Sequence, residues 1–368
     1  MAEERIRVGL IGANVNYGWG VRAHVPALRA LPEYELVAVC TTRRETAEAS
    51  AQAFGARVAL WDYRELVRHP DVDVVAVSVR LPLHHDMVMA ALGAGKHVFC
   101  EWPLGVNVAE AEAMAAAAEG RGVRHMVGLQ ARATPSLLRL KELVEEGYVG
   151  QVLAANVKML LPGIMERDVS RAWMAERAKG AHSLSIAAGH ALDIVCHCLG
   201  ELAEASAEVR TQVRQWRMVG TGEVVAVDAP DNVMVQGVLA GGGAISAHIA
   251  YVPYHTSGWR LEVYGDQGTL VASSPQMVQF VESRLEGARR GDDGLRELPI
   301  PERLVWVPPT VPKGIPFNVA QMYRRLAQAI GDGKPAQPDF HEAVRRHRML
   351  AALEQAAAEG RRLVMPPL

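Results

Sequence analysis

The stretch RVGLIGANVNYGWG, residues 7–20, is the most informative segment of this sequence. It joins an apolar run, Arg7–Ile11, to a glycine-containing loop and a helical segment. The first amides of a helix are unpaired and the helix dipole favours anions, so such a junction suits a phosphate group. Gly12 fits the pattern G-x-G-x-x-G, but Asn14 replaces the second glycine and Gly18 follows an insertion. Asparagine tolerates left-handed backbone conformations, so we predict a dinucleotide-binding loop, with a ligand-free glycine turn as the alternative.

Outward from this loop, the first third of the chain alternates short β-rich runs with helical segments. Strands that alternate with helices imply βαβ crossovers and a parallel sheet. The runs are nearly continuous in Val, Ile and Ala, which is typical of strands covered on both faces. We therefore predict an α/β fold with an N-terminal Rossmann domain, a doubly wound parallel sheet, over residues 1–130. Its expected strands are Arg7–Ile11, Glu35–Cys40, Val72–Ser78, His97–Cys100 and His125–Leu129.

After Gln130 the pattern changes, because long β runs with fewer helices replace the regular alternation. The run Gly241-Gly242-Gly243 separates two of them and indicates a hairpin turn, since glycine accepts the positive φ that such turns need. We predict a second, α+β domain over residues 131–368 with an open, mostly antiparallel sheet, whose terminal helices can return to the first domain. Its expected strands are Gln151–Leu161, Ala205–Arg217, Asn232–Ala240, Ala244–Val252, Trp259–Gly265 and Thr269–Ala272.

Composition excludes several classes of protein. The chain has 368 residues, of which 49% are hydrophobic and 22% charged, and a formal net charge of -2, so no overall field favours nucleic acid or an anionic membrane. No run approaches the roughly 20 apolar residues that span a bilayer, and the acidic start does not resemble a secretory signal. The four cysteines lie in apolar stretches, which is typical of buried thiols in a reducing compartment. We expect a cytoplasmic protein.

The end of the second strand indicates which dinucleotide binds. NAD-binding proteins usually place an acidic residue there for the ribose hydroxyl, whereas arginine accommodates a 2′-phosphate. Here the strand is followed by Thr41, Thr42, Arg43 and Arg44, with no acid before Glu45. Hydroxyl and guanidinium groups suit a phosphate dianion, so we predict NADP in preference to NAD. A solvated basic loop is the alternative.

Further cofactor contacts are expected where strands of the same sheet end or the next segments begin. Together with the phosphate loop, these predicted contacts are Gly12, Asn14, Gly18, Trp19, Ser78, His84, Glu101, Trp102 and Gln130.

Four longer segments occur in the order and spacing of one known family. They are HVPAL (24–28), GKHVFCEWPL (95–104), GHALDIV (189–195) and YGDQGTL (264–270). On these segments the sequence resembles the glucose-fructose oxidoreductase, inositol dehydrogenase and MocA family over nearly the whole chain. The resemblance implies a Rossmann domain, a small-molecule substrate and an open C-terminal sheet that often forms dimers. We expect a homodimer or a dimer of dimers.

Two acid/base positions of the family differ here. A lysine normally follows the glutamate of the second segment, whereas this chain has Trp102, whose indole cannot titrate. An aspartate normally lies four residues before the histidine of the third segment, whereas this chain has Ile186. The predicted catalytic set is therefore His190, Asp193 one helical turn beyond it, and Lys158 as a replacement for the missing ammonium. A solvent-facing lysine is the commoner role of such a residue.

The same losses occur in the galactose-pathway repressor branch of that family, a noncatalytic branch that binds a dinucleotide and a protein partner. This chain is similar to that branch in Gly12-Ala13-Asn14 with Gly18-Trp19, in Glu101-Trp102 and in Leu129–Arg132. The G-H-x-x-D-I segment at residues 189–194 is also shared.

The residues that remain allow an oxidoreductase. Hydride transfer from a carbinol needs a base, and the imidazole of His190 titrates near neutral pH, although a buried helix histidine is the alternative. Arg171 and Trp173 are candidates for an anion contact and a wall of the substrate site, with Trp102 beside the nicotinamide; ordinary packing is the alternative for these side chains. Adjacent residues on a helix point in different directions, so Cys196-His197-Cys198 does not predict a metal site.

The sequence therefore leaves three hypotheses open. The first is an NADP-dependent oxidoreductase acting on a small, sugar-like or cyclic, hydroxyl or carbonyl compound, and the retention of His190 favours it. The second is a catalytically silent dinucleotide-binding regulator, which the losses at Trp102 and Ile186 favour. The third is a redox-neutral enzyme that uses a tightly held cofactor for transient oxidation. Substrate identity, reaction direction and oligomeric state do not follow from the sequence.

Overall fold

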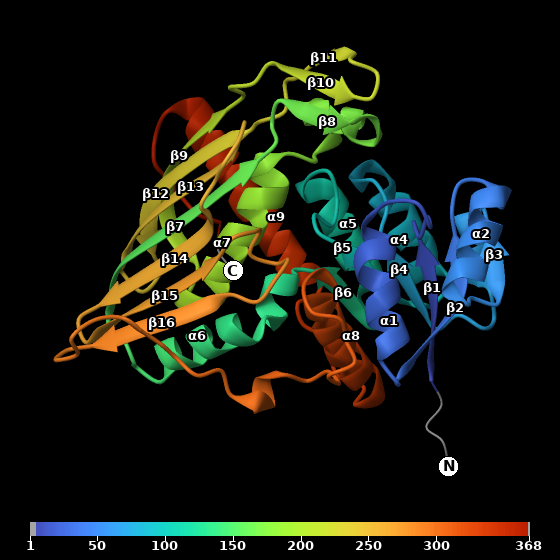
Figure 1. Cartoon of the computed structure of the whole chain (residues 1–368), viewed down its shortest axis with the longest axis horizontal. Coiled ribbons are helices and arrows are strands. Elements are labelled where there is room, and N and C mark those ends of the chain that lie inside the picture. The colour runs from blue at the N-terminus through green and yellow to red at the C-terminus, as the bar shows by residue number, and fades with distance from the viewer. Residues whose placement is uncertain (1–4, 367–368) are drawn as a thin grey trace. The chain divides into compact units, whose positions relative to one another are not determined.

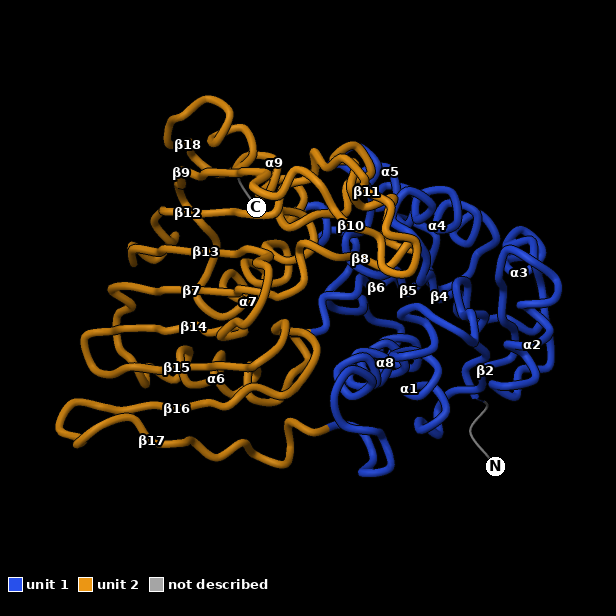
Figure 2. The backbone as a smooth tube through the Cα atoms, turned by 45° about the horizontal axis from the view of Figure 1, so that its top comes forward, with its two compact units in different colours: residues 1–130, 306–344 blue, residues 131–305, 345–368 orange. Residues whose placement is uncertain are grey.

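A computed structural model describes residues 5–366, which form two compact units (Figures 1 and 2). The first unit comprises the chain up to Gln130 and the later segment Trp306–Val344. The second comprises Ala131–Val305 and the chain from Arg345 onward. The segment Trp306–Val344 thus belongs to the first unit, although we predicted it within residues 131–368. No helix formed by residues 5–366 is long and apolar enough to cross a membrane.

The first unit contains a six-stranded parallel sheet in the order β3-β2-β1-β4-β5-β6. The predicted doubly wound parallel sheet is confirmed. Strand order reverses between β1 and β4, and in such sheets ligands bind outside the carboxyl ends of the strands at this switch point. The strands are β1 Ile6–Ile11, β2 Tyr34–Cys40, β3 Val58–Leu60, β4 Val74–Val77, β5 His97–Glu101 and β6 His125–Gly128.

Local signals set the bounds of several helices in this unit. The side chain of Asp62 accepts the amide of Arg64 where α3 begins, and Asn107 accepts the amide of Glu110 where α5 begins. Gly55 ends α2 in the left-handed conformation, at φ 74°. The helices are α1 Val25–Ala30, α2 Arg44–Phe54, α3 Tyr63–Arg68, α4 His84–Gly93, α5 Val108–Ala118 and α8 Ile315–Gly331.

An aromatic cluster explains why α8 belongs to the first unit. The ring of Tyr323 on α8 lies 4.8 Å from the ring of Phe99 on β5 and 5.2 Å from that of Tyr34 on β2. The Tyr34 hydroxyl also donates to the Tyr323 carbonyl oxygen at 2.8 Å. All three side chains are fully buried, so α8 completes the core of this sheet.

The second unit contains a nine-stranded sheet in the order β17-β16-β15-β14-β7-β13-β12-β9-β18. Only β7 and β13 pair in parallel, so the predicted open, mostly antiparallel sheet is confirmed. Its strands are β7 Val152–Pro162, β9 Leu202–Arg210, β12 Asn232–Leu239, β13 Ala244–Val252, β14 Gly258–Gly265, β15 Gly268–Ser274, β16 Arg284–Arg289, β17 Arg296–Glu297 and β18 Leu363–Val364.

A separate three-stranded sheet, β11-β10-β8, belongs to the same unit (Figure 1). Its strands are β8 Glu166–Asp168, β10 Gln215–Val219 and β11 Val224–Ala226. The prediction of one continuous strand over Ala205–Arg217 is wrong, because the chain leaves the large sheet at Arg210 and enters the small one at Gln215. The carboxylate of Asp231 accepts the amides of Gln212 and Val213 at this turn.

Helices cover only one face of the nine-stranded sheet. On β7 the side chains of Val157 and Met159 are buried, whereas those of Asn156 and Lys158 are exposed, as alternation in a half-covered sheet requires. The helices α6 and α7 lie along the buried face (Figure 1). Their bounds, with those of the last long helix, are α6 Pro135–Glu145, α7 Gly189–Leu199 and α9 Phe340–Glu359.

Candidate dinucleotide and catalytic sites

The phosphate loop is held at the switch point by its own backbone. Gly12 donates its amide to the Cys40 carbonyl at 2.9 Å, and Ser78 donates to the Ile11 carbonyl at 3.0 Å. Gly12 has φ 95°, and a Cβ there would lie 2.0 Å from the carbonyl oxygen of Ser78. A Cβ at Gly20 would lie 2.9 Å from the Gly12 carbonyl oxygen. Only glycine fits both positions without movement of the backbone.

Asn14 acts differently from our expectation. No residue other than glycine has a positive φ between residues 5 and 366, so Asn14 does not use the left-handed conformation that asparagine tolerates. Instead its side-chain oxygen accepts the amide of Asn16 at 2.9 Å and closes a local turn. The second left-handed residue of the loop is Gly18, at φ 106°. Trp19 follows it, immediately before the π-helical turn Gly20–His24.

Two buried polar atoms at the same strand ends lack partners. Ser78 Oγ, just beyond β4, and Gln130 Oε1, just beyond β6, form no hydrogen bond within the described chain. Buried polar atoms are nearly always hydrogen-bonded, so such atoms at the carboxyl edge of a parallel sheet fit a polar ligand. The glycine loop and these two atoms thus lie at the same carboxyl edge of the parallel sheet.

A polar chain runs behind this edge within the first unit. Gln130 Nε2 donates to Glu101 Oε2 at 2.7 Å, and Glu101 Oε1 lies 2.9 Å from His24 Nε2. The other ring nitrogen of His24 lies 2.7 Å from the Tyr323 hydroxyl. His24 and Tyr323 were not predicted as site residues. The HVPAL segment contains His24, but nothing in the sequence connects Tyr323 to Glu101.

The predicted contacts around Trp102 are buried. Trp102 has an exposed fraction of only 6% and His84 of only 2%. The ring nitrogens of His84 approach the carbonyl oxygens of Pro103 at 3.0 Å and Val79 at 3.2 Å. Burial lowers the pKa of His84, which keeps the ring neutral. His84 thus supports the Trp102–Pro103 segment from a buried position.

The threonines that follow β2 have different environments. Thr41 is buried, and its hydroxyl donates to the Arg43 carbonyl at 3.0 Å and lies 2.6 Å from the Thr46 hydroxyl. Thr42 is exposed. Thr41 therefore shapes the loop, whereas the Thr42 hydroxyl is available to a ligand.

The two arginines of this loop also differ. Arg44 pairs with Glu48 at 2.8 Å and its guanidinium lies 5.5 Å from the ring centroid of Trp61. Arg43 is exposed and forms no ion pair within residues 5–366. Arg43 is thus the guanidinium without a competing carboxylate. Trp61, which follows β3 and is 48% exposed, was missed because a three-residue strand gave no signal to place it beside β2.

In the second unit, His190 and Asp193 both lie on α7, with exposed fractions of 4% and 1%. The Asp193 carboxylate accepts two hydrogen bonds from Arg132, at 2.9 and 2.6 Å, and lies 3.6 Å from Arg346 Nε. Arg346 also pairs with Glu201. The Asp193 carboxylate thus contacts two guanidinium groups, which makes it a structural ion-pair partner and not the predicted acid/base residue.

Lys158 and His190 do not lie on the same side of the large sheet. Its exposed side chain lies on the face of β7 opposite Val157 and Met159, which pack toward the helices. His190 belongs to α7, on the covered face. Because successive side chains of a strand point to opposite faces, Lys158 lies away from His190, and the structure does not bring the two predicted catalytic residues together.

Arg171 and Trp173 lie on the short 3-10 segment Val169–Ala175 of the second unit. Arg171 is exposed and Trp173 is half-buried. Their neighbours Ala172 and Met174 pack against the buried cluster of the small sheet. This segment is therefore fixed by alternate residues that leave Arg171 open to solvent.

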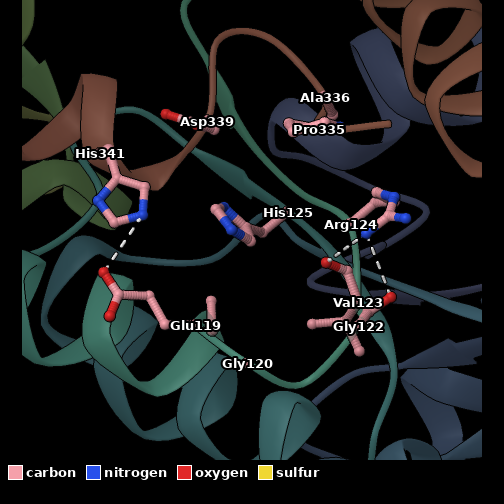
Figure 3. A pocket seen from close by; sticks show the side chains of 11 residues that line it. Glu119, Gly120, Gly122, Val123, Arg124, His125, Pro335, Ala336, Asp339 and His341 are labelled. Carbon is pink, nitrogen blue, oxygen red and sulfur yellow. Dashed lines mark hydrogen bonds and ion pairs between the residues drawn. The ribbon is translucent and has the colours of Figure 1, made fainter. Parts of the chain in front are cut away.

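A pocket of about 180 Å³ lies at the other edge of the parallel sheet (Figure 3). It includes His125, the first residue of β6, and His341, whose Nε2 lies 3.6 Å from a Glu119 oxygen. The amino edge of the strands is opposite the phosphate loop, so this pocket is not the dinucleotide site. No group of three or more His, Cys, Asp or Glu side chains that could hold a metal ion occurs in the described chain.

Comparison with protein families agrees with this architecture. Residues 6–129 match the model of an oxidoreductase family with an NAD-binding Rossmann fold, GFO_IDH_MocA. Residues 135–274 match the model of the Gal80p C-terminal domain. The chain thus combines a Rossmann domain of the GFO_IDH_MocA type with a C-terminal domain of the Gal80p type. The resemblance inferred from the four sequence segments is thereby confirmed.

Individual relatives are distant. The dehydrogenase aclE of Aspergillus oryzae is 36% identical over 204 residues, which are 54% of this chain and 56% of that protein. Levoglucosan dehydrogenase of Pseudarthrobacter phenanthrenivorans is 26% identical over 290 residues, 73% of each chain. The structure of an oxidoreductase domain protein from Kribbella flavida superimposes with a TM-score of 0.86 at 26% identity and covers 100% of both chains.

Proposed function

We propose that this protein is an NADP-dependent oxidoreductase acting on a small hydroxyl or carbonyl compound, sugar-like or cyclic. The observation that carries the proposal is the glycine loop at the switch point, where a Cβ at Gly12 would collide with Ser78. Unpartnered atoms of Ser78 and Gln130 at the same strand ends support it. The similarity to levoglucosan dehydrogenase supports a sugar-like substrate.

The choice of NADP rests on the loop after β2. Thr42 and Arg43 are exposed there, and Arg43 has no carboxylate partner among the described residues. A guanidinium and a hydroxyl would bind the 2′-phosphate in the place where NAD-specific proteins carry an acid. NAD is the alternative cofactor.

The bound nicotinamide would supply or accept the hydride. Of the chain's own residues, His190 is the proposed group that takes up or releases the hydroxyl proton, because its imidazole can exist in both protonation states. Glu101, held between His24 and Gln130, is proposed to position groups at the carboxyl edge of the sheet. Arg171 and Trp173 are retained as proposed substrate contacts, and a dimer or dimer of dimers as the proposed assembly.

A second candidate function has its own support. Trp102 and Ile186 replace two acid/base residues of the family, and residues 135–274 match the Gal80p C-terminal domain. These features favour a regulator that binds a dinucleotide and does not turn over a substrate.

One experiment separates these candidates. Purified protein is mixed with NADPH and a panel of sugar-like and cyclic carbonyl compounds, and the nicotinamide absorbance is followed. Turnover that falls at least 100-fold in His190→Ala, on the scale of ~10²–10⁴ for general acid/base groups, supports the enzyme. His255→Ala, which changes an exposed histidine of the same unit, is the matched control. Saturable NADPH binding without turnover of any compound supports the regulator.

A further inference from the structure

The small sheet of the second unit has one buried face. Trp216 and Met218 on β10 point to this face, and Val225 on β11 pairs with Trp216. They pack against a buried apolar cluster. Its other buried members are Ile164, Ala175, Val227 and Ala229.

An arginine lies on this apolar face. Arg167 of β8 is the register partner of Met218, so the two side chains project from the same side of the sheet. Its guanidinium carbon lies 5.1 Å from the ring centroid of Trp216 and 5.0 Å from that of Tyr251 on β13 (Figure 1 labels these strands). Arg167 is therefore held between two aromatic rings and not extended into solvent.

The charge of Arg167 has no counter-ion in the described chain. Neither Arg167 nor the nearby Arg171 forms an ion pair with a carboxylate of residues 5–366. Burial lowers the pKa of Arg167, and the charge of Arg171 lowers it further. Burial raises the pKa of Tyr251, whereas both guanidinium groups lower it. The two arginines thus act on the same small region, and a nearby carboxylate, that of Asp168, is influenced by the charge of Arg171 without forming an ion pair with either arginine.

Hydrogen-bond donors are left over in the same place. Arg167 Nε and Trp216 Nε1 are both buried, and neither has an acceptor within the described residues. An unpaired cation and two unsatisfied donors on an apolar face destabilise a fold unless an acceptor reaches them. An acceptor that carries negative charge would satisfy the donors and balance the guanidinium charge.

We propose that Arg167 and Arg171, backed by Trp216 and Tyr251, form a binding site for a small molecule that carries a carboxylate or phosphate group. The planar guanidinium suits the paired oxygens of either group, and stacking between two rings fixes its orientation. The Tyr251 hydroxyl can add a further donor. The site consists of residues of the second unit and does not require a bound dinucleotide, but it shares Arg171 with the proposed substrate contacts.

Direct binding tests the site in the full chain. Inorganic phosphate and malonate are titrated calorimetrically at low ionic strength into wild type, Arg167→Met and Arg171→Met. We expect at least one of the two anions to bind saturably, and each substitution to weaken that binding tenfold or more. The tighter anion then assigns the ligand as a phosphate or a carboxylate compound.

Arg217→Met is the matched control. Arg217 lies on β10 beside Trp216 but on the exposed face of the small sheet, so the change removes the same charge from the strand that pairs with β8. Its anion affinity is expected to remain within twofold of wild type. Equal anion affinity in wild type, Arg167→Met and Arg217→Met would overturn the proposal, because it would show only general attraction to a basic surface.

Thermal unfolding gives a second readout that does not need calorimetric heat. Without anion, Arg167→Met is expected to melt at a higher temperature than wild type, because methionine suits the apolar face. Phosphate or malonate should then raise the melting temperature of wild type and Arg217→Met but not that of Arg167→Met. A lower melting temperature for Arg167→Met, with no anion effect on wild type, would show that Arg167 only packs the sheet.

Discussion

The two carboxylates that we predicted in functional sites, Glu101 and Asp193, have different environments. Glu101 contacts the side chains of His24 and Gln130 and keeps 14% of its side chain exposed, at the carboxyl edge of the parallel sheet. Asp193 is 1% exposed and bound by the guanidinium of Arg132. A carboxylate that pairs with buried arginines stabilises the fold, whereas a partly exposed one in a hydrogen-bonded polar chain can contact a ligand.

The largest effect is expected from Asp193→Asn. It removes the charge that compensates buried guanidinium groups, so the free energy of unfolding should fall by roughly 3–5 kcal/mol. Glu101→Gln should cost about 1 kcal/mol, since it weakens hydrogen bonds without stranding a guanidinium. Urea unfolding measures both. Equal losses for Asp193→Asn and Glu101→Gln would remove the distinction between the two sites.

A surface pair provides the reference for that experiment. Glu204 on β9 pairs with Arg362 at 2.7 Å, and both side chains are at least 40% exposed. Glu204→Gln should therefore change the free energy of unfolding by less than about 1 kcal/mol.

Acid tests the buried region around Asp193 and Arg346 in another way. His347 is the neighbour of Arg346 on α9, and burial lowers the pKa of His347 from 6.5 to about 4. The folded state therefore binds fewer protons than the unfolded state between these values, and stability falls as the pH drops from 6.5 toward 4. The loss should reach about 3 kcal/mol. Unfolding curves at several pH values measure it, and His347→Gln should flatten the dependence. An unchanged slope in that variant would contradict the assignment.

The backbone conformation of the loop at the carboxyl edge of the parallel sheet is tested at Gly12. Alanine at Gly12 must adopt φ near 95° and meet the Ser78 carbonyl, which should cost roughly 1–3 kcal/mol from the backbone alone. Gly93→Ala is the control, because Gly93 lies in α4 with nothing within 4 Å of an added Cβ. Chemical unfolding of both variants distinguishes them. A Gly12→Ala variant as stable as wild type would mean that the loop is not held as described.

Arg43→Ala is expected to act on ligand binding and not on the stability of the fold. Removing one exposed guanidinium from the proposed 2′-phosphate contact should weaken NADPH binding about tenfold and leave NADH binding within twofold. Arg57→Ala, which removes an exposed arginine paired with Glu35, is the control. Fluorescence titrations measure the affinities of wild type and of both variants for NADPH and NADH. A parallel loss of NADPH and NADH affinity would contradict a role specific to the extra phosphate.

The sequence predicted the parallel sheet well because most residues of its longer strands are buried and their apolar runs are nearly continuous. It missed β3, because Val58–Leu60 is only three half-buried residues long. It also joined β9 to β10, because the break depends on Asp231, a residue beyond both strands that binds the intervening amides.

Site residues were harder to predict for the same reason. The partners of Asp193 lie 61 residues before it and 153 after it, and no local pattern connects them. Lys158 was predicted on the wrong face of β7. The apolar residues Leu153 and Leu160 project from opposite faces of this strand, so the sequence alone does not show which face is buried. Arg167 gave no signal at all, since only the folded sheet reveals its lack of a counter-ion.

The central claim is that the loop containing Gly12, together with Arg43, binds a dinucleotide. Isothermal titration of the purified full chain with NADPH and NADH tests this claim directly. We predict saturable binding of both at one site per chain, with NADPH bound about tenfold more tightly. No heat from either nucleotide at millimolar concentration would contradict the claim, and with it both the oxidoreductase and the regulator.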